Sequence, residues 1–126
     1  MAGVGAKRGR ISRSADFDAA FRRGRSHSTR HLVVYALERP DVTPTEPDVP
    51  RLGIAVSRKV GNAVVRNRLK RQLREAFVRV SADLPAATDF VVIARPSLPP
   101  AIEAQGFEWL VGEVRETAAR TTGRAT

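Results

Sequence analysis

The spacing of apolar positions is most regular between residues 62 and 80. Apolar side chains recur there at steps of three and four residues, which predicts an amphipathic helix with one buried stripe. Asn62 is the expected N-cap, because its side-chain oxygen can accept a hydrogen bond from a free backbone N–H of the first turn. The helix is expected to end around Val80. The stripe consists of Val65, Leu69, Leu73, Ala76, Phe77 and Val80.

Three shorter apolar runs predict strands, over Arg30–Glu38, Arg51–Ser57 and Asp89–Arg95. The third run is apolar enough for a central strand. The second is expected to pair back on the first, so that residues 39–50 form a hairpin loop. Four prolines exclude regular structure from that loop.

Two further helices are expected near the ends of the chain. Ser14 is the expected N-cap of the first, Ala15–Arg23, and Gly24 is expected to end it. The last helix is expected over Ala101–Arg120, after a proline-rich breaker. Gly106 weakens this last helix by about 1 kcal/mol relative to alanine.

The order of these elements is helix, strand, strand, helix, strand, helix. It predicts an α+β fold, a mixed α/β two-layer sandwich in which the sheet packs on helices. A chain of 126 residues is expected to form one domain. Residues 1–10 are expected to be a flexible basic leader, and residues 121–126 a loose tail.

Charge changes this picture, because it is concentrated in one part of the chain. The net charge is +9 and the sequence pI is about 11.4. Nine Lys or Arg and one acid lie between Arg51 and Arg79, whereas residues 31–50 carry −3 and residues 81–126 carry −2. A polyanion is therefore the expected partner, with nucleic acid favoured over an anionic membrane surface.

The basic residues of the central helix share faces. Arg66, Lys70 and Arg74 form a second stripe with Arg71 beside it, and Asn67 and Arg68 project near the positive end of the helix dipole, which suits phosphate. A solvated basic helix is the alternative interpretation. It usually alternates Glu with Lys or Arg four residues apart, and this helix barely does so.

The sequence offers no catalytic constellation and no metal site of its own. There is no cysteine, and the acids lie away from the basic helix, where a two-metal nuclease would need them. His27–Arg30 is expected to be a loop, and both histidines, His27 and His31, to be solvated. No apolar run approaches the ~20 residues of a membrane-spanning helix, and a cytoplasmic location is expected.

Two phenylalanines on the first predicted helix could also serve nucleic acid. Phe17 and Phe21 lie four residues apart on one face, beside a run of arginines, and Tyr35 on the first strand could join them. Aromatic rings beside arginines are typical of sites for single-stranded nucleic acid, where bases stack on the rings. Ordinary core packing is the alternative for the two phenylalanines, and a half-buried tyrosine with a solvated hydroxyl is the alternative for Tyr35.

The run Ser57–Arg71, SRKVGNAVVRNRLKR, resembles the signature of the bacterial ribonuclease P protein subunit, and the match is near-continuous over Arg51–Phe77. It is weaker over Phe17–Tyr35 and recognisable again over Asp89–Pro96. Arg58 stands where lysine is common in the family, and the loop at residues 39–50 is long. The resemblance implies a left-handed β-α-β crossover around the central helix.

The resemblance also implies a function. The RNA subunit of ribonuclease P, with the Mg²⁺ that it holds, cleaves the 5′ leader from precursor tRNA, and the protein subunit assists it as a monomer in the ribonucleoprotein. No catalytic residue, bound metal or small-molecule substrate is implied for the protein. The residues implied to bind the catalytic RNA are Arg66, Asn67, Arg68, Lys70, Arg71 and Arg74. Those implied to line the cleft for the single-stranded leader are Phe17, Phe21, Tyr35 and Ser57, with Arg58 or Lys59.

Two other functions fit the charge pattern. A structural RNA-binding protein of ribosomal type could share the fold and the basic helix without any role in tRNA processing. A DNA-binding helix could use its arginines in a major groove, usually as part of a dimer, but no dimerisation stripe is visible.

Overall fold

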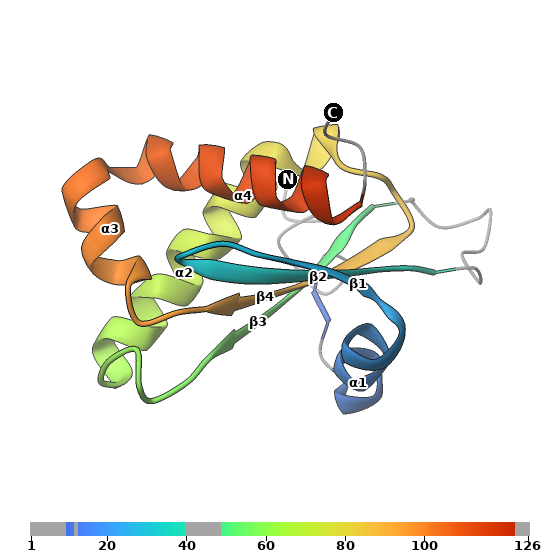
Figure 1. Ribbon diagram of the computed structural model, residues 1–126, viewed down its shortest axis with the longest axis horizontal. Helices are drawn as coiled ribbons and strands as arrows, with labels where there is room; N and C mark the ends of the chain where they lie inside the picture. The colour runs from blue at the N-terminus through green and yellow to red at the C-terminus, as the bar shows by residue number, and fades with distance from the viewer. Residues whose placement is uncertain (1–9, 12, 40–48, 123–126) are drawn as a thin grey trace.

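The computed structural model describes residues 10–11, 13–39 and 49–122, which form one four-stranded sheet with helices on both faces (Figure 1). The strands are β1 (Arg25–Ser28), β2 (Leu32–Glu38), β3 (Arg51–Val56) and β4 (Thr88–Ala94). The helices are α1 (Ser14–Arg23), α2 (Ala63–Val80), α3 (Leu98–Gln105) and α4 (Phe107–Thr121), with a short 3-10 turn, η2 (Ser81–Asp83). The α+β prediction is confirmed.

The strand order is β1-β2-β4-β3, with β4 antiparallel to β2 and parallel to β3. The prediction that the third apolar run is central is therefore confirmed. The expected hairpin between the first two runs is wrong, because β4 lies between β2 and β3. Six of the seven residues of β4 are buried, as expected for a central strand that has a neighbour on each side and is covered on both faces. Residues 40–48 of the expected loop lie outside the described residues.

One face of the sheet is covered by α2 and α4, and α1 lies against the other face (Figure 1). The predicted stripe of α2 points into the larger core, where each fully buried leucine contributes about 1.5–3 kcal/mol. Val65 is only half-buried; the other five members are buried. The main partners of the stripe from the sheet and α4 are Leu32, Val34, Phe90, Val92, Leu110 and Val114.

The helix ends follow the local sequence in most places. Asn62 caps α2 as predicted, because its side-chain Oδ1 accepts a hydrogen bond of 3.0 Å from the backbone N–H of Val65. Gly24 follows α1 directly, also as predicted. The prediction for Ser14 is wrong: it is the first helical residue, and the cap position is held by Arg13, whose side chain makes no capping bond.

Two segments differ from the sequence prediction. The segment around His27 is strand β1, not a loop, because pairing with β2 and packing against α4 outweigh its weak strand propensity. The last helix is broken at Gly106, whose φ of 95° ends α3 and turns the chain into α4. The helix α3 begins at Leu98, inside the expected breaker, since the two prolines that follow lie in its first turn, where no intrahelical N–H bond is lost.

His31 is not simply solvated, as the sequence had suggested. Its Nδ1 shares a hydrogen bond of 2.8 Å with Ser97 Oγ, and the Ser97 hydroxyl lies 3.1 Å from the backbone oxygen of Arg30. Its ring meets the Trp109 ring edge-on at 5.3 Å between centroids. These contacts tie the turn between β1 and β2 to the start of α3 and α4.

Candidate nucleic-acid interface

The basic side chains of α2 lie on both sides of the helix and along its outer crest. Arg66, Lys70 and Arg74 share one side of α2, as the helical spacing predicts, and Arg74 lies near Arg10, which bridges to Leu52 of β3. The Nε of Arg66 donates a hydrogen bond of 3.1 Å to the backbone oxygen of Gly61, which fixes this side chain at the start of the helix. Asn67 and Arg71 are exposed on the crest.

Arg68 lies on the opposite side of α2, two residues or about 200° of helical turn from Arg66. It borders a cavity of about 380 Å³ between α2 and the α3–α4 corner. The other residues around this cavity are Val65, Leu69, Gln72, Pro99, Ile102, Glu103 and Phe107. The Arg-Asn-Arg triplet therefore presents cations on both flanks of one helix.

These cations have no anionic partner within the described part of the protein. None of Arg66, Arg68, Lys70, Arg71 and Arg74 lies within 4.0 Å of a described carboxylate, although arginines elsewhere in the chain are paired. Burial lowers the pKa of Arg74, and the nearby positive charge of Arg10 lowers it further. Such repulsion between like charges is relieved when a polyanion binds.

Three aromatic residues meet on the other face of the sheet, where α1 lies. The rings of Phe17 and Phe21 are 6.5 Å apart between centroids, and Phe21 meets Tyr35 edge-on at 5.0 Å. Phe21 is 41% exposed, and the other two are half-buried over a small core of Ile11, Ala20 and Val91. The prediction that Tyr35 joins Phe17 and Phe21 is therefore confirmed.

A row of small and apolar side chains extends the aromatic cluster across the sheet. Strand register places Ser28, Val33, Ile93 and Ala55 side by side on the face that carries Tyr35. The two outer strands contribute an exposed serine and a half-buried alanine, so the row is accessible. Together the cluster and the row form one surface on this face of the sheet, which we call the aromatic cleft because the family resemblance implies a cleft at these rings.

Ser57, Arg58 and Lys59 are exposed in the turn after β3, at one end of the aromatic cleft. Ser57 continues the alternation of Gly53 and Ala55 on the cleft face. It lies four residues from Gly53, or about 13 Å at the usual strand rise. The structure therefore does not bring these three residues into the aromatic cluster itself; it places them at the end of the cleft nearest the start of α2.

Arg95 was missed by the sequence analysis. It directly follows β4, its backbone N–H donates to the oxygen of His31, and it is exposed. Alternation from Val91 and Ile93 puts its side chain on the cleft face, beside Ser57 on the neighbouring strand. The sequence could have indicated Arg95, because it continues the alternation of Val91 and Ile93 and therefore lies on the same face of the strand.

A buried ion-pair network supports the opposite end of the cleft. Asp89 is 3% exposed and accepts two hydrogen bonds from Arg51, of 2.8 Å to Oδ1 and 2.7 Å to Oδ2. Arg39 also pairs with Asp89, and Asp16 of α1 lies 3.4 Å from Arg51. The hydrogen bond that Arg51 donates to Asp89 raises the pKa of Arg51, although burial opposes this rise. The network leaves no uncompensated buried carboxylate under the cleft.

The described residues hold neither a metal-binding cluster nor a membrane-spanning helix. Within those ranges, no group of three or more histidine, aspartate or glutamate side chains is placed to hold a metal ion. No helix among the same residues is long and apolar enough to cross a membrane.

Comparisons with known proteins agree with this geometry. The Ribonuclease P family profile matches residues 6–121. The ribonuclease P protein component of Bacillus cereus is 42% identical over 89 residues, covering 71% of this chain and 73% of the relative, and that of Oleidesulfovibrio alaskensis is 38% identical, covering 96% and 98%. Among solved structures, the RNase P protein from Thermotoga maritima superposes with a TM-score of 0.75 at 33% identity, covering 88% of this chain and 96% of that one. The RNase P protein of Staphylococcus aureus gives 0.68 at 35%, covering 89% and 99%. The chain therefore belongs to the ribonuclease P protein family.

Proposed function

We propose that this chain is the RNA-binding subunit of ribonuclease P. In this proposal α2 binds the catalytic RNA, and the aromatic cleft binds the single-stranded 5′ leader of precursor tRNA. Membership of the family makes the ribonuclease P RNA its partner. The observation that carries the finer assignment is the separation of two surfaces. Cations with no partner among the described residues gather on α2, and aromatic rings in contact with one another gather on the opposite face of the sheet.

The α2 surface suits a folded RNA. Its cations flank the helix on both sides, so one helix can neutralise phosphates from two neighbouring RNA segments. The N-terminus of α2, capped by Asn62 and free of acids in its first turn, adds partial positive charge at the same end. Because these contacts release counterions, binding should weaken steeply with salt.

The catalyst in this proposal is the RNA, with Mg²⁺ held by the RNA. The protein neutralises repulsion between the two polyanions, catalytic RNA and precursor tRNA, and so lowers the Mg²⁺ concentration needed for assembly and cleavage. A monomer within the ribonucleoprotein, acting in the cytoplasm, is the form that we expect.

The cleft suits a single strand. Phe21 offers an exposed ring for a base, and this ring meets Tyr35 edge-on and Phe17 at a tilt. Base–aromatic stacking is worth about 1–3 kcal/mol per base and tolerates any sequence. Arg95 and the basic turn of Arg58 and Lys59 can hold the backbone where the leader meets the tRNA body.

The test compares precursor and mature tRNA. With the reconstituted holoenzyme, Phe17→Ala combined with Phe21→Ala should weaken precursor tRNA binding by at least about fivefold, the equivalent of one lost stacked base. Mature tRNA, which has no leader, should bind as before. The affinity of the same variant for the catalytic RNA serves as the control, because it shows whether the variant is folded. Equal losses for both tRNAs would remove the leader-cleft assignment.

A further inference from the structure

The cavity of about 380 Å³ beside Arg68 has apolar walls. It lies where α3 runs beside the first half of α2 and continues into α4 (Figure 1). Leu69 of α2 and Ile102 of α3 line it and are buried. Val65, Pro99 and Phe107 also line it, and each of these three is only half-buried. Packing of the three helices therefore leaves apolar surface accessible at this corner.

The ring of Phe107 is restrained at the edge of this cavity. The guanidinium carbon of Arg79 lies 5.7 Å from the ring centroid, in a cation–π contact. Arg79 also donates hydrogen bonds of 2.9 and 3.1 Å from its Nη2 to the two carboxylate oxygens of Glu108. Arg79 does not line the cavity, so the Phe107 ring contacts a cation outside the cavity and still contributes surface to it. These contacts restrict the ring before any ligand binds.

Polar side chains accompany the apolar walls. Arg68 and Glu103 line the cavity and are exposed, and Gln72 is half-buried. The cavity thus offers a guanidinium, which only donates hydrogen bonds, a carboxylate, which only accepts them, and an amide, which does both. Apolar walls with a small number of polar groups are typical of a site that binds a small molecule or a single chemical group.

The surface around Arg68 indicates which kind of group this is. Arg68 is one of the cations of α2 that have no anionic partner among the described residues, and Arg71 is exposed three residues further along. Val64 precedes Arg68 by four residues on the same face and is 75% exposed. Cationic and apolar surface therefore meet beside the cavity, on the helix to which we assign RNA binding.

An unstacked nucleotide has the properties that match this surface. Its phosphate is anionic, the faces of its base are apolar, and the edges of its base donate and accept hydrogen bonds. Proteins bind unpaired RNA bases by stacking them on aromatic rings or guanidinium groups and by hydrogen-bonding their edges. An apolar side chain of another protein would fill the cavity but would leave the cations of α2 without a partner.

We propose that this cavity receives one unstacked nucleobase of the ribonuclease P RNA, with the base against Phe107 and its phosphate held by Arg68. The proposal rests on the proposed binding of the catalytic RNA by α2. It adds a contact that does not depend on charge, so part of the affinity should persist at salt concentrations that weaken the phosphate contacts.

Filling the cavity tests this proposal. Gln72→Phe places a larger side chain at the cavity without changing the net charge. It should weaken binding of a bacterial ribonuclease P RNA by at least about fivefold, the low end for one stacked base. Gln105→Phe is the matched control, because Gln105 is exposed on α3 and does not line the cavity, and it should leave the affinity unchanged. Unchanged or tighter RNA binding by Gln72→Phe would overturn the proposal.

A second variant keeps the test independent of how Gln72→Phe folds. Phe107→Leu retains an apolar side chain but removes the flat ring, and it should weaken RNA binding by a similar factor. Thermal unfolding shows whether each variant is folded at the temperature of the binding measurement. A folded Phe107→Leu variant with native affinity would show that no base stacks on this ring.

The salt dependence distinguishes a base contact from a phosphate contact. Arg68→Ala should reduce the slope of log K against log salt concentration by about 0.7–0.9, the value for one lost phosphate contact. Gln72→Phe should lower the affinity at every salt concentration and leave this slope unchanged. If both variants reduce the slope equally, Gln72→Phe acts on the cations of α2, and the base site is refuted.

Chemical probing of the RNA identifies the base. One nucleotide should be protected from base-modifying reagents, dimethyl sulfate or a carbodiimide, in the native complex and reactive in the complex with Gln72→Phe. An abasic residue at that nucleotide should weaken native binding about as much as Gln72→Phe does. The two changes together should weaken binding no more than either change alone, because both remove the same contact. Fully additive losses would contradict the contact.

The outcomes distinguish this proposal from the proposed function. If Arg66→Ala with Arg68→Ala weakens RNA binding but Gln72→Phe and Phe107→Leu do not, α2 binds the RNA and the cavity holds no base. Should the arginine variant bind the RNA as tightly as the native protein, the assignment of RNA binding to α2 fails, and with it the basis of this proposal.

Discussion

Gly53 gives the sharpest test of how the cleft is built, because the Phe17 ring lies directly over it. A Cβ atom added at Gly53 would lie 2.7 Å from both Cε1 and Cζ of that ring and 3.3 Å from Cβ of Ile11. Contacts below about 3 Å are too short for carbon atoms, whose optimal separation is about 3.5–4.0 Å. Gly53→Ala must therefore push the Phe17 ring away from the sheet.

The expected magnitude follows from two opposing terms. Overpacking a filled site costs about 1–3 kcal/mol of unfolding free energy. Replacing a strand glycine by alanine returns about 0.5–1 kcal/mol, because the unfolded chain loses conformational freedom. The net loss should be about 1 kcal/mol, or roughly 4 °C in Tm for a domain of this size.

Thermal unfolding and tRNA binding together check this prediction. Gly53→Ala should lower Tm and should weaken holoenzyme binding of precursor tRNA, by up to the ~1–3 kcal/mol of one stacked base, without affecting mature tRNA. Gly112→Ala is the matched control: it lies exposed on α4, no atom would come within 4 Å of the new Cβ, and it should raise stability by about 1 kcal/mol with no effect on binding. If Gly53→Ala changes neither Tm nor binding, the position of Phe17 is wrong; if only Tm falls, the ring has no part in leader binding.

Three further predictions concern the rest of the molecule. Arg68→Ala should reduce holoenzyme activity at low Mg²⁺ and leave Tm unchanged, because the side chain is exposed and unpaired among the described residues; full activity at low Mg²⁺ would contradict its role. Asp89→Asn should lower the midpoint of urea unfolding by the equivalent of about 1–3 kcal/mol, because Arg39 and Arg51 lose a buried counter-charge but keep some access to water. An unchanged midpoint would show that the ion-pair network adds no stability. Gly106→Ala should destabilise by about 1 kcal/mol or more, because alanine resists a φ of 95°, and a gain in Tm would argue against the break between α3 and α4.

The local sequence was enough to predict an element where the spacing of its apolar residues and the residues at its ends indicate the same helix or strand. The stripe and Asn62 together defined α2, and the continuous apolar run of β4 predicted a central strand. The strand order was not predictable in this way. A long connection between β2 and β3 allows the two strands to pair directly or to lie on either side of a third strand. The structure shows the second arrangement, in which β4 lies between them and is buried on both faces.

The strand β1 was missed because its sequence, Arg-Ser-His-Ser, has no apolar alternation. Its stability comes from hydrogen bonds to β2 and from packing on α4, which are tertiary effects. The missed strand matters for the site, since it adds Ser26 and Ser28 to the face of the sheet that carries Tyr35.

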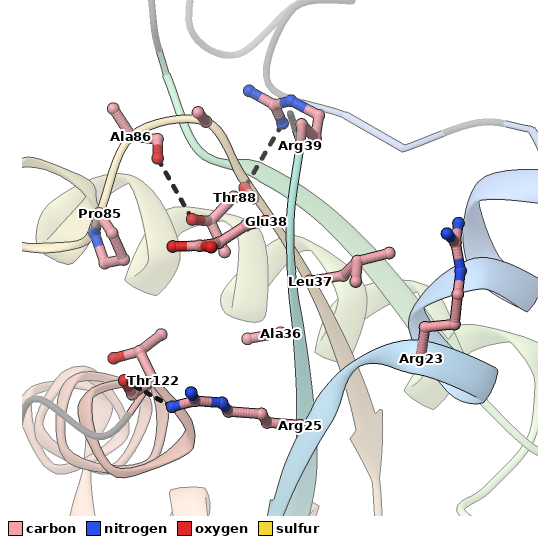
Figure 2. Close-up of a pocket in the computed structure, with 11 residues that line it drawn as sticks. Arg23, Arg25, Ala36, Leu37, Glu38, Arg39, Pro85, Ala86, Thr88 and Thr122 are labelled. Carbon is pink, nitrogen blue, oxygen red and sulfur yellow. Dashed lines mark hydrogen bonds between the residues drawn. The ribbon is translucent and has the colours of Figure 1, made fainter. Parts of the chain in front are cut away.

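Side-chain placement in the site was predictable only where one element carries the group. Phe17 and Phe21 were found from their spacing on one helix, and Tyr35 from the alternation of one strand. The opposite directions of Arg66 and Arg68 also follow from helical spacing, but the cavity beside Arg68 requires α3 to be placed. The arginines that line the pocket shown in Figure 2, Arg23, Arg25 and Arg39, come from α1, from β1 and from the residue after β2, so no single stretch of sequence indicates them.

The most direct test of the central claim is cleavage of a 5′-extended precursor tRNA by a bacterial ribonuclease P RNA at low Mg²⁺, with and without this protein. The account predicts cleavage at the mature 5′ end only when RNA and protein are both present, and none with the protein alone. If the protein binds the RNA but cleavage at low Mg²⁺ is the same without it, the chain is a structural RNA-binding protein and has no role in removing the leader.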